Sequence, residues 1–352
     1  MGYRRFTSTA LITAALTVGG AAAEDEIELA GPSGDPSIVS PDAQIETLFD
    51  GAIFTEGPAV APDGSVYFSD ITFTALSGMM AGNIWRYDPQ SGKTAVYRSP
   101  SGMSNGLKID AQGRLVACEG ADFGGRRVTR TDLATGKAEI VAGLYNGRPF
   151  NSPNDVSFDE KGRIYFSDPR YAGHEAVDQE IPSVYRVDPD GSIERIITDA
   201  GKPNGVAVSP DQKSLYVVSN DNGSTALFRN HPEPPPARKG RMALLAYDLR
   251  EDGTATYREE LVNYYPEDGP DGLVCDAEGN LWVAVRDETR YGIAVYSPAG
   301  KELAFIPTPE VPTNVAFGRG KEAKTLYMTY SGEKGILGKI QVNKKGYRLP
   351  SK

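Results

Sequence analysis

The sequence predicts an all-β protein that forms a six-bladed β-propeller with four antiparallel strands in each blade. Three observations support this fold class. One phrase of sequence recurs six times, at intervals of roughly 40 to 50 residues that are typical of propeller blades. No long stretch shows the hydrophobic period of a helix. The chain also contains 39 glycines and 25 prolines, as the many turns of an all-β protein require.

Each copy of the phrase reads as a turn, a short apolar strand, a second turn of the form Asp-x-x-Gly, and a strand rich in Tyr, Val and Leu. A third strand follows, as at Val184–Asp188, and a fourth strand comes after a glycine-containing turn, as at Glu194–Ile197. Four short strands in each repeat are typical of a propeller blade. The six copies begin at Glu56, Ser104, Pro153, Pro203, Pro270 and Pro312.

The predicted ring needs one more strand to close it. The stretch Ile45–Phe49 reads as a strand that precedes the first repeat, and the last repeat ends near Val342. We expect this N-terminal strand to complete the sixth blade, because closing the ring removes an open sheet edge. We therefore assign residues 44–352 to one propeller domain. Residues 24–43, which are rich in Gly, Pro, Ser and Asp, are expected to form a linker.

Residues 1–23 have the three-part layout of a secretory signal peptide. Arg4 and Arg5 supply a positive start, an apolar run covers residues 10–22, and an Ala-x-Ala cleavage site ends directly before Glu24. The run is too short to span a bilayer, and no later stretch is a transmembrane candidate. The sequence therefore predicts a periplasmic or secreted protein with no integral membrane segment after signal cleavage.

Composition limits the classes of function. The formal net charge is −10, whereas a nucleic-acid-binding protein needs a basic surface, so we expect no nucleic-acid partner. Two histidines, His174 and His231, are too few for a histidine-rich zinc site and disfavour a Ser-His-Asp triad. The two cysteines, Cys118 and Cys275, fall on opposite sides of the predicted ring, so we expect two buried free thiols.

Side chains that carry oxygen recur at one place in the repeat. The first strand of each blade lines the central channel, so the residue at its head lies near the axis. Oxygen ligands without histidine or thiolate favour a hard cation such as Ca²⁺ or Mg²⁺. Asn-Gly and Asp-Gly pairs also form turns, but glutamate is a poor turn residue, so the set favours one axial divalent cation. The head residues are Glu56, Asn105, Asn154, Asn204, Asp271, and either Thr313 or Asn314.

Four motifs in the repeats resemble the gluconolactonase/regucalcin-like family, which also contains luciferin-regenerating enzyme. They are Glu-Gly-Pro from Glu56, Pro-Asn-Asp from Pro153, Pro-Asn-Gly from Pro203 and, as the most specific, Pro-Asp-Gly-Leu-x-x-Asp-x-x-Gly-Asn-Leu-Trp-Val-Ala from Pro270. The resemblance extends over about residues 45–345, and the export signal is most similar to that of exported bacterial gluconolactonases. It implies a six-bladed propeller with a divalent metal on its axis.

The resemblance also implies roles for the head residues. It implies that Glu56, Asn204 and Asp271 bind the metal, and it places Asn154 beside the metal or the substrate, so that we count Asn154 among the ligands. The expected metal is Ca²⁺, with Mg²⁺, Mn²⁺ or Zn²⁺ as alternatives. Asp271 is also the residue that the resemblance implies for proton transfer. Asn105 occupies the corresponding position in blade two, and we expect it to bind substrate together with Asn154.

One departure from the family pattern concerns the substrate. Animal regucalcin has an arginine two residues before the blade-three asparagine, and this chain has Ser152 there. Arg170, Tyr171 and His174 follow the second strand of the same blade. They either replace that arginine in substrate binding or belong to an ordinary solvated loop. The two long loops that we expect to form partial lids are 168–182 and 220–242.

The sequence therefore predicts a carboxylic ester hydrolase that acts on a sugar lactone such as glucono-1,5-lactone. The metal would polarise the lactone carbonyl, and Asp271 would take a proton from the attacking water and return it to the ring oxygen. The same site could hydrolyse another ester or a phosphotriester. Two further alternatives are a non-enzymatic ligand-binding propeller and strictosidine-synthase-like chemistry, which needs no axial metal. We expect the protein to be a monomer or a homodimer.

Overall fold

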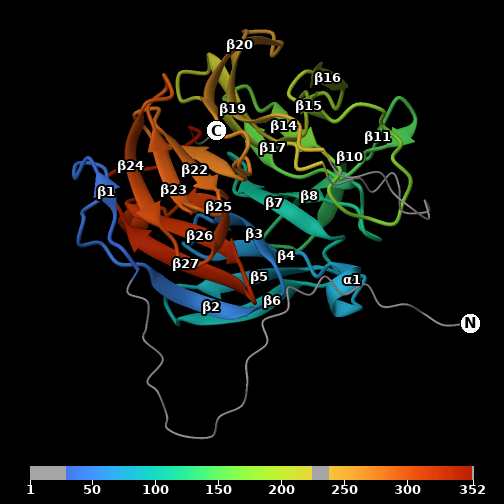
Figure 1. Cartoon of the computed structure of the whole chain (residues 1–352). Helices are drawn as coiled ribbons and strands as arrows, with labels where there is room; N and C mark the ends of the chain where they lie inside the picture. Colours follow the sequence, from blue (N-terminus) through green and yellow to red (C-terminus); the bar gives the residue numbers. More distant parts are fainter. Residues whose placement is uncertain (1–28, 224–237, 351–352) are drawn as a thin grey trace, which may run out of the picture.

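The computed structural model describes residues 29–223 and 238–350, and these residues are almost entirely β-structure. Six antiparallel sheets follow one another around a ring, which confirms the predicted six-bladed propeller (Figure 1). The predicted signal peptide, residues 1–23, and the middle of the long loop 220–242 lie outside the described residues. Within the described ranges, no helix has the length and apolar character that crossing a membrane requires.

The first three blades are each built from four consecutive strands. Blade one consists of β3 (Thr55–Val60), β4 (Val66–Asp70), β5 (Asn83–Asp88) and β6 (Lys93–Arg98). Blade two consists of β7 (Ser104–Ile109), β8 (Leu115–Glu119), β9 (Arg127–Thr131) and β10 (Ala138–Ala142). Blade three consists of β13 (Val156–Phe158), β14 (Ile164–Asp168), β15 (Ser183–Val187) and β16 (Ile193–Ile197).

The remaining three blades repeat this order, except that β1 adds a fifth strand to blade five and β2, from the N-terminal side, is the fourth strand of blade six. Blade four consists of β17 (Pro203–Val208), β18 (Ser214–Asn220), β19 (Met242–Leu249) and β20 (Ala255–Asn263). Blade five consists of β21 (Leu273–Cys275), β22 (Leu281–Val285), β23 (Gly292–Tyr296), β24 (Glu302–Pro307) and β1 (Ser33–Gly34). Blade six consists of β25 (Val311–Phe317), β26 (Thr325–Ser331), β27 (Gly335–Gln341) and β2 (Glu46–Ala52). Outside the blades lie β11 (Leu144–Tyr145), β12 (Arg148–Pro149), α1 (Thr74–Ser77) and a 3₁₀ turn (Gly320–Glu322).

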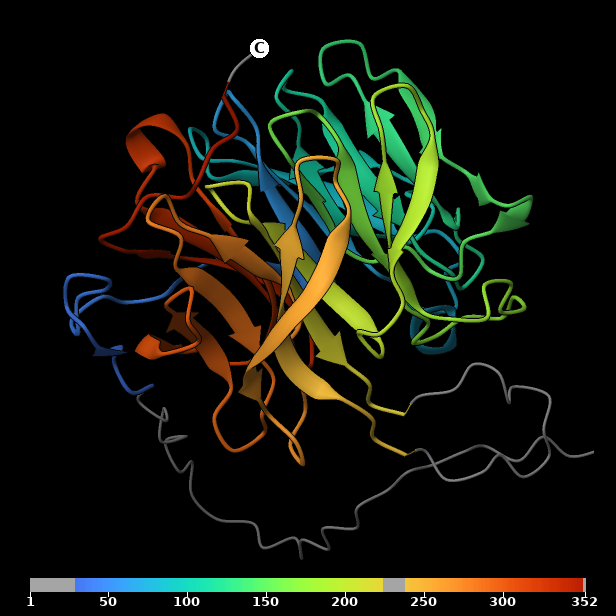
Figure 2. The ribbon, with the colours of Figure 1, turned by 90° about the horizontal axis from the view of Figure 1, so that it is seen from above.

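The N-terminal strand closes the ring, as the sequence predicts. β2 pairs with β27 at the rim of blade six, so that strands from the two ends of the propeller share one sheet. Residues 29–43, which belong to the expected linker, lie against the propeller. There β1 pairs with β24 at the edge of blade five (Figures 1 and 2). Ile38 and Val39 are buried against blades five and six. Strand pairing and the burial of these two apolar side chains hold this segment on the propeller.

Apolar side chains fill the spaces between neighbouring blades. The second strand of a blade, such as β22, is buried along its whole length because other strands and blades cover both of its faces. This explains why these strands read as continuous apolar runs. At the contact between blades five and six, the Trp282 ring packs edge-on against Phe317, with ring centroids 5.2 Å apart. Cys118 and Cys275 are buried and free, as expected.

The repeated Asp-x-x-Gly turns join the first two strands of a blade. In blade five, the buried Asp276 carboxylate accepts hydrogen bonds from the amides of Glu278 and Asn280 and from the Trp282 indole, at 2.9, 2.9 and 3.1 Å. Asp110 binds the equivalent turn of blade two in the same manner. These aspartates stabilise turns at the tails of the first strands, at the end of the channel away from the head residues.

Candidate active site

Head residues from five blades meet in one cavity of about 240 Å³ at one end of the channel. Each stands at or just before the start of a first strand, so the propeller architecture brings together side chains that are far apart in the sequence. The first strands of neighbouring blades contact one another around the axis. The five head residues that line the cavity are Glu56, Asn105, Asn154, Asn204 and Asp271.

Blade six contributes to the cavity indirectly. Neither Thr313 nor Asn314 is among the described residues that line it. Instead, the Thr313 hydroxyl donates to the Thr55 carbonyl at 2.8 Å, and Asn314 Nδ2 donates to Glu56 Oε2 at 3.0 Å. Blade six therefore fixes the position of Glu56 and does not offer a head residue of its own.

Glycines directly after the head residues let neighbouring first strands approach closely. The Gly106 amide donates to the Asn154 carbonyl at 2.6 Å. A Cβ atom on Gly205 would lie 2.5 Å from the carbonyl oxygen of Asp271 and 2.7 Å from a methyl carbon of Leu273. Both glycines lie inside strands, in β7 and β17. The Asn-Gly pairs here therefore serve close packing around the axis and not chain reversal.

Replacing Gly205 by alanine should destabilise the protein by about 2 kcal/mol, because the added methyl group overlaps the backbone beside Asp271. Chemical denaturation followed by circular dichroism measures this loss. Gly143→Ala is the matched control, since a Cβ atom there meets only a methyl group of Ile140 at 3.3 Å. Equal losses for the two variants would contradict the packing role of Gly205.

Glu56 and Asp271 form a buried carboxyl pair. Burial, followed by repulsion from Asp271 and Asp155, raises the pKa of Glu56 well above its ordinary value. Burial also raises the pKa of Asp271, although Arg286 and hydrogen bonds from Asn204 and Glu56 oppose this shift. Two carboxyl groups buried together repel each other unless a proton or a cation lies between them. The pair is therefore suited to binding a cation.

Arg286 is a site residue that the sequence analysis missed. It directly follows β22, lines the cavity, and donates from Nη1 to Asp271 Oδ2 at 2.8 Å. Its guanidinium holds the Asp271 carboxylate in place, and its charge lowers the pKa of Asp271 against the larger effect of burial. The sequence does contain a signal for Arg286, because this charged residue directly follows the apolar run 281–285. That Arg286 reaches the active site depends on β22 lying beside Asp271, whose amide donates to the Ala284 carbonyl at 2.8 Å.

A third buried carboxylate, Asp155, lies next to the head residue of blade three. It occupies the position that glycine has in blades one, two, four and five. Its two carboxylate oxygens accept hydrogen bonds from the amides of Val156 at 2.9 Å and Val206 at 3.2 Å. Burial raises the pKa of Asp155 to about 6, and the charge of Lys108 opposes this shift. Asp155 therefore connects blades three and four beside the channel.

Polar groups that suit substrate hydroxyls surround the carboxyl pair. Asn105 Oδ1 is buried and has no hydrogen-bond partner within the described structure. Asn204 Nδ2 donates to the Tyr171 hydroxyl at 3.3 Å, and this hydroxyl donates to the Asn220 carbonyl at 3.0 Å. Burial raises the pKa of Tyr171 well above its ordinary value, so that the hydroxyl stays protonated. Of the three residues considered as replacements for the missing arginine, Tyr171 lines the cavity.

Arg170 and His174 are not among the described residues that line this cavity. The buried Arg170 guanidinium donates to the carbonyls of Asn151 at 2.9 Å and Glu175 at 2.6 Å, and it thereby braces its own loop. His174 is partly exposed, and its Nδ1 lies 2.7 Å from Asp122 Oδ1. The path of the loop after β14 points these two side chains away from the active-site cavity. The sequence pattern does not encode this path.

The donor set fits a hard divalent cation. Glu56 and Asp271 supply two carboxylates, which balance the charge of such an ion, and Asn154 and Asn204 supply neutral amide oxygens. The unpartnered Asn105 oxygen adds one more acceptor at the same cavity. In the part of the chain that the structure describes, no group of three His, Cys, Asp or Glu side chains could hold a metal ion. A metal at this cavity therefore requires the amide ligands.

Comparison with known proteins agrees with this geometry. Residues 54–332 match the family model described as SMP-30/Gluconolactonase/LRE-like region. The chain is 28% identical over 322 residues to a gluconolactonase of Zymomonas mobilis, which covers 84% of this chain and 81% of that protein. The structure of a gluconolactonase from Xanthomonas campestris is similar with a TM-score of 0.73 at 27% identity, over 90% of this chain and 95% of that one.

The fold is shared with a more distant protein as well. Regucalcin from Agrobacterium tumefaciens, described as a calcium-binding protein, is similar with a TM-score of 0.66 at 22% identity, over 88% of this chain and 97% of that one. The fold and the site together define the class of protein, a six-bladed propeller with an axial cavity lined by carboxylates and amides. The chain belongs to the SMP-30/gluconolactonase/LRE-like family, since the family model covers most of its length. This confirms the family resemblance of the repeat motifs.

Proposed function

We propose that this protein is a metal-dependent lactonase that hydrolyses a sugar lactone, such as an aldono-1,5-lactone, to the open-chain acid. The observation that carries this proposal is the buried pair of Glu56 and Asp271 in one cavity with amide side chains from three further blades. The lactone-hydrolase class of the enzyme rests on its family and on relatives named gluconolactonase.

The chain's own residues account for the proton transfers of hydrolysis. Asp271 takes a proton from the water whose oxygen bonds to the lactone carbonyl carbon. It returns that proton to the ring oxygen as the bond between this oxygen and the carbonyl carbon breaks. Arg286, whose Nη1 lies 2.8 Å from Asp271 Oδ2, orients this carboxyl group for both transfers. Asn105 and Asn154 orient the substrate hydroxyls, and Tyr171 presents its hydroxyl to the same cavity.

A divalent cation bound by Glu56, Asn154, Asn204 and Asp271 would polarise the lactone carbonyl and stabilise the negative charge that develops on its oxygen. Ca²⁺ is the first candidate because all four ligands offer oxygen atoms. The fold neighbour regucalcin is described as a calcium-binding protein, which agrees with this choice. Mg²⁺, Mn²⁺ and Zn²⁺ are the alternatives, and elemental analysis of the purified protein separates them.

Hydrolysis of glucono-1,5-lactone by the purified protein, followed as acid release, tests the proposed function. Ca²⁺ should raise the rate well above spontaneous hydrolysis, a chelator should abolish the increase, and added Ca²⁺ should restore it. Turnover of simple esters or phosphotriesters without turnover of any lactone would overturn the substrate class. Tightly bound metal without any turnover would instead favour a ligand-binding propeller.

Replacing Arg286 by methionine should lower kcat/KM about 10- to 100-fold, because Asp271 loses the ion pair that positions its carboxylate. Steady-state kinetics at saturating metal measure this change. Arg130→Met is the matched control, since Arg130 pairs with Glu139 on the outer strands of blade two and should leave the kinetics unchanged. Equal kinetics for wild type and Arg286→Met would remove Arg286 from the active site.

We further propose that the enzyme acts in the periplasm or outside the cell, as a monomer or a homodimer. The charge and hydrophobicity pattern of residues 1–23 supports export. Mass spectrometry of the exported protein should find Glu24 as its first residue, and finding Met1 there would contradict cleavage. Sedimentation of the same material measures the oligomeric state.

A further inference from the structure

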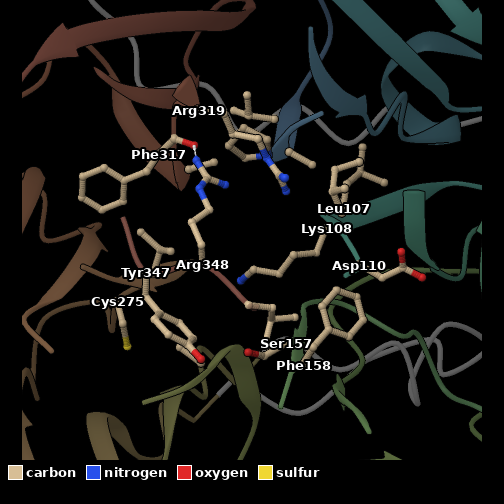
Figure 3. Close-up of a pocket in the computed structure, with 18 of the residues that line it drawn as sticks. Leu107, Lys108, Asp110, Ser157, Phe158, Cys275, Phe317, Arg319, Tyr347 and Arg348 are labelled. Carbon is tan, nitrogen blue, oxygen red and sulfur yellow. Dashed lines mark hydrogen bonds between the residues drawn. The ribbon is translucent and has the colours of Figure 1, made fainter. Parts of the chain in front are cut away.

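A second cavity, of about 340 Å³, lies at the end of the channel opposite to the candidate active site. The tails of the first strands line it, including Ile109 of β7 and Phe317 of β25, whereas the heads of the first strands of blades one to five line the active-site cavity. Tyr347 and Arg348 from the C-terminal segment also line it (Figure 3), as does Leu349 of the same segment. This cavity therefore combines residues from the blades with residues that follow the last strand.

One residue in this second cavity departs from the pattern of the repeat. Three positions after each head residue, the first strand carries a side chain that lines the cavity. In five blades this side chain is small, but in blade two it is Lys108. The ring of small side chains consists of Ala59, Ser157, Ala207, Val274 and Ala316. The lysine therefore brings a charge into a ring that is otherwise uncharged.

Two arginines join Lys108. Arg319 follows β25, Arg348 lies in the C-terminal segment, and all three cationic side chains extend into the same cavity (Figure 3). Arg348 donates to the carbonyls of Phe317, at 3.0 Å, and Gly318, which carry no formal charge. None of the three cations forms an ion pair with any other residue in the described ranges, 29–223 and 238–350.

The two carboxylates that line this cavity have other partners. Asp110 accepts a hydrogen bond from Arg114 Nε at 2.8 Å and also binds the amides of its own turn. Asp155 accepts hydrogen bonds from the amides of Val156 and Val206. Three cations against two carboxylates leave one net positive charge in this cavity, although the whole chain carries a formal charge of −10.

Lys108 and Arg319 are partly buried, whereas Arg348 is more exposed. Burial lowers the pKa of Arg319, and burial together with the charge of Arg319 lowers the pKa of Arg348 to about 10. Arg319 Nε is buried without a hydrogen-bond partner among the described residues. Taking a cation partly out of water without a partner costs free energy, whereas an anion between the three groups would satisfy both their charges and their donors.

We propose that this second cavity binds a small anionic molecule through a carboxylate or phosphate group. Lys108, Arg319 and Arg348 would contact the anionic group, because guanidinium donors match the oxygens of both groups. Apolar side chains such as those of Phe158 and Leu349 line other parts of the cavity, and its volume is in the range of small-molecule sites. This site lies apart from the proposed lactonase site and does not depend on that function.

Thermal unfolding of the full protein, freed of metal over a chelating resin, tests the anion site. Inorganic phosphate or succinate is added, and sodium chloride matches the ionic strength. At ten times its dissociation constant, a binding anion should raise the unfolding temperature of the wild type by about 2 °C. A response to phosphate alone assigns the site to phosphate, and a response to succinate alone assigns it to carboxylate.

Arg319→Met should lose most of this anion-dependent gain. Without added anion it should unfold at the same temperature as the wild type or higher, because the variant removes a partly buried cation that forms no ion pair within the described ranges. Lys108→Met is the second variant, since the other five blades already carry small uncharged residues at this position. It should weaken the response in the same direction and should not disturb the fold.

Two controls locate the effect. Arg130→Met removes one positive charge from outer strands, and Arg286→Met removes the cation of the active-site cavity. Both should keep the full anion-dependent gain. The anion site is disproved if neither anion stabilises the wild type beyond chloride, if Arg319→Met and Lys108→Met keep the gain, or if Arg286→Met alone loses it.

Discussion

Replacing Asp271 by asparagine should lower kcat/KM for lactone hydrolysis by about 1000-fold or more, while the propeller stays folded. Asparagine keeps the shape of the aspartate side chain and one of the two carboxylate oxygens. The asparagine amide cannot accept a proton at neutral pH. It also carries no negative charge that could pair with Arg286 or balance a cation. Acid-release kinetics measure the activity, and circular dichroism verifies the fold.

Asp271→Ala separates the two roles proposed for this residue. Alanine also removes the remaining oxygen, so this variant should lose bound metal as well as activity, whereas Asp271→Asn should retain part of the metal. Elemental analysis after dialysis measures both. Asp252→Asn, in an exposed turn of blade four where the carboxylate binds Thr254, is the matched control and should behave as the wild type. Wild-type turnover in Asp271→Asn would exclude this residue from proton transfer.

Replacing Glu56 by glutamine should remove most of the stability that Ca²⁺ gives to the protein. In the wild type, a cation at 1000 times its dissociation constant should add about 4 kcal/mol to the free energy of unfolding. The variant keeps an amide oxygen but leaves only Asp271 to balance the charge of the ion, so its affinity should fall strongly. Denaturant unfolding with and without Ca²⁺ measures the difference.

Without metal, Glu56→Gln should no longer be less stable than the wild type. Burial and repulsion from Asp271 and Asp155 raise the pKa of Glu56 above its unfolded value. A carboxyl group with a raised pKa contributes stability at low pH that is lost as the pH rises through the folded value. Glu56→Gln has no such loss and should be at least as stable as the metal-free wild type at pH 8. Glu139→Gln, at the exposed pair with Arg130, is the control for the change of charge.

A markedly less stable Glu56→Gln in the absence of metal would contradict this account of the site. It would mean that the hydrogen bonds from Asn314 and Gly57 to the Glu56 carboxylate, at 3.0 and 2.5 Å, outweigh the electrostatic cost of the buried charge. Unchanged Ca²⁺-dependent stability in the variant would place the metal elsewhere. Each of the two measurements therefore tests a different part of the proposal.

The sequence by itself determined the fold and the axial positions of the site. A blade is a largely local structure, because at least three of its strands are consecutive in every blade and its turns carry their own stabilising residues, such as Asp276. Six copies therefore predict six blades, and the stretch from Ile45 predicts the closing strand. The place of a residue in the repeat also sets its height along the channel, which is why head residues such as Glu56 and Asp271 could be predicted to meet.

Only the tertiary structure decided which other side chains reach these positions. Arg286 meets Asp271 through the pairing of β22 with the first strand of its blade, while Arg170, although next in the chain to the cavity-lining Tyr171, turns away from the same cavity. The cations of the second cavity, such as Arg348, come from two blades and the C-terminal segment. The physical reason is that a repeat records local backbone and burial preferences. Contacts between distant segments depend instead on ring closure and on the paths of loops, which no single repeat encodes.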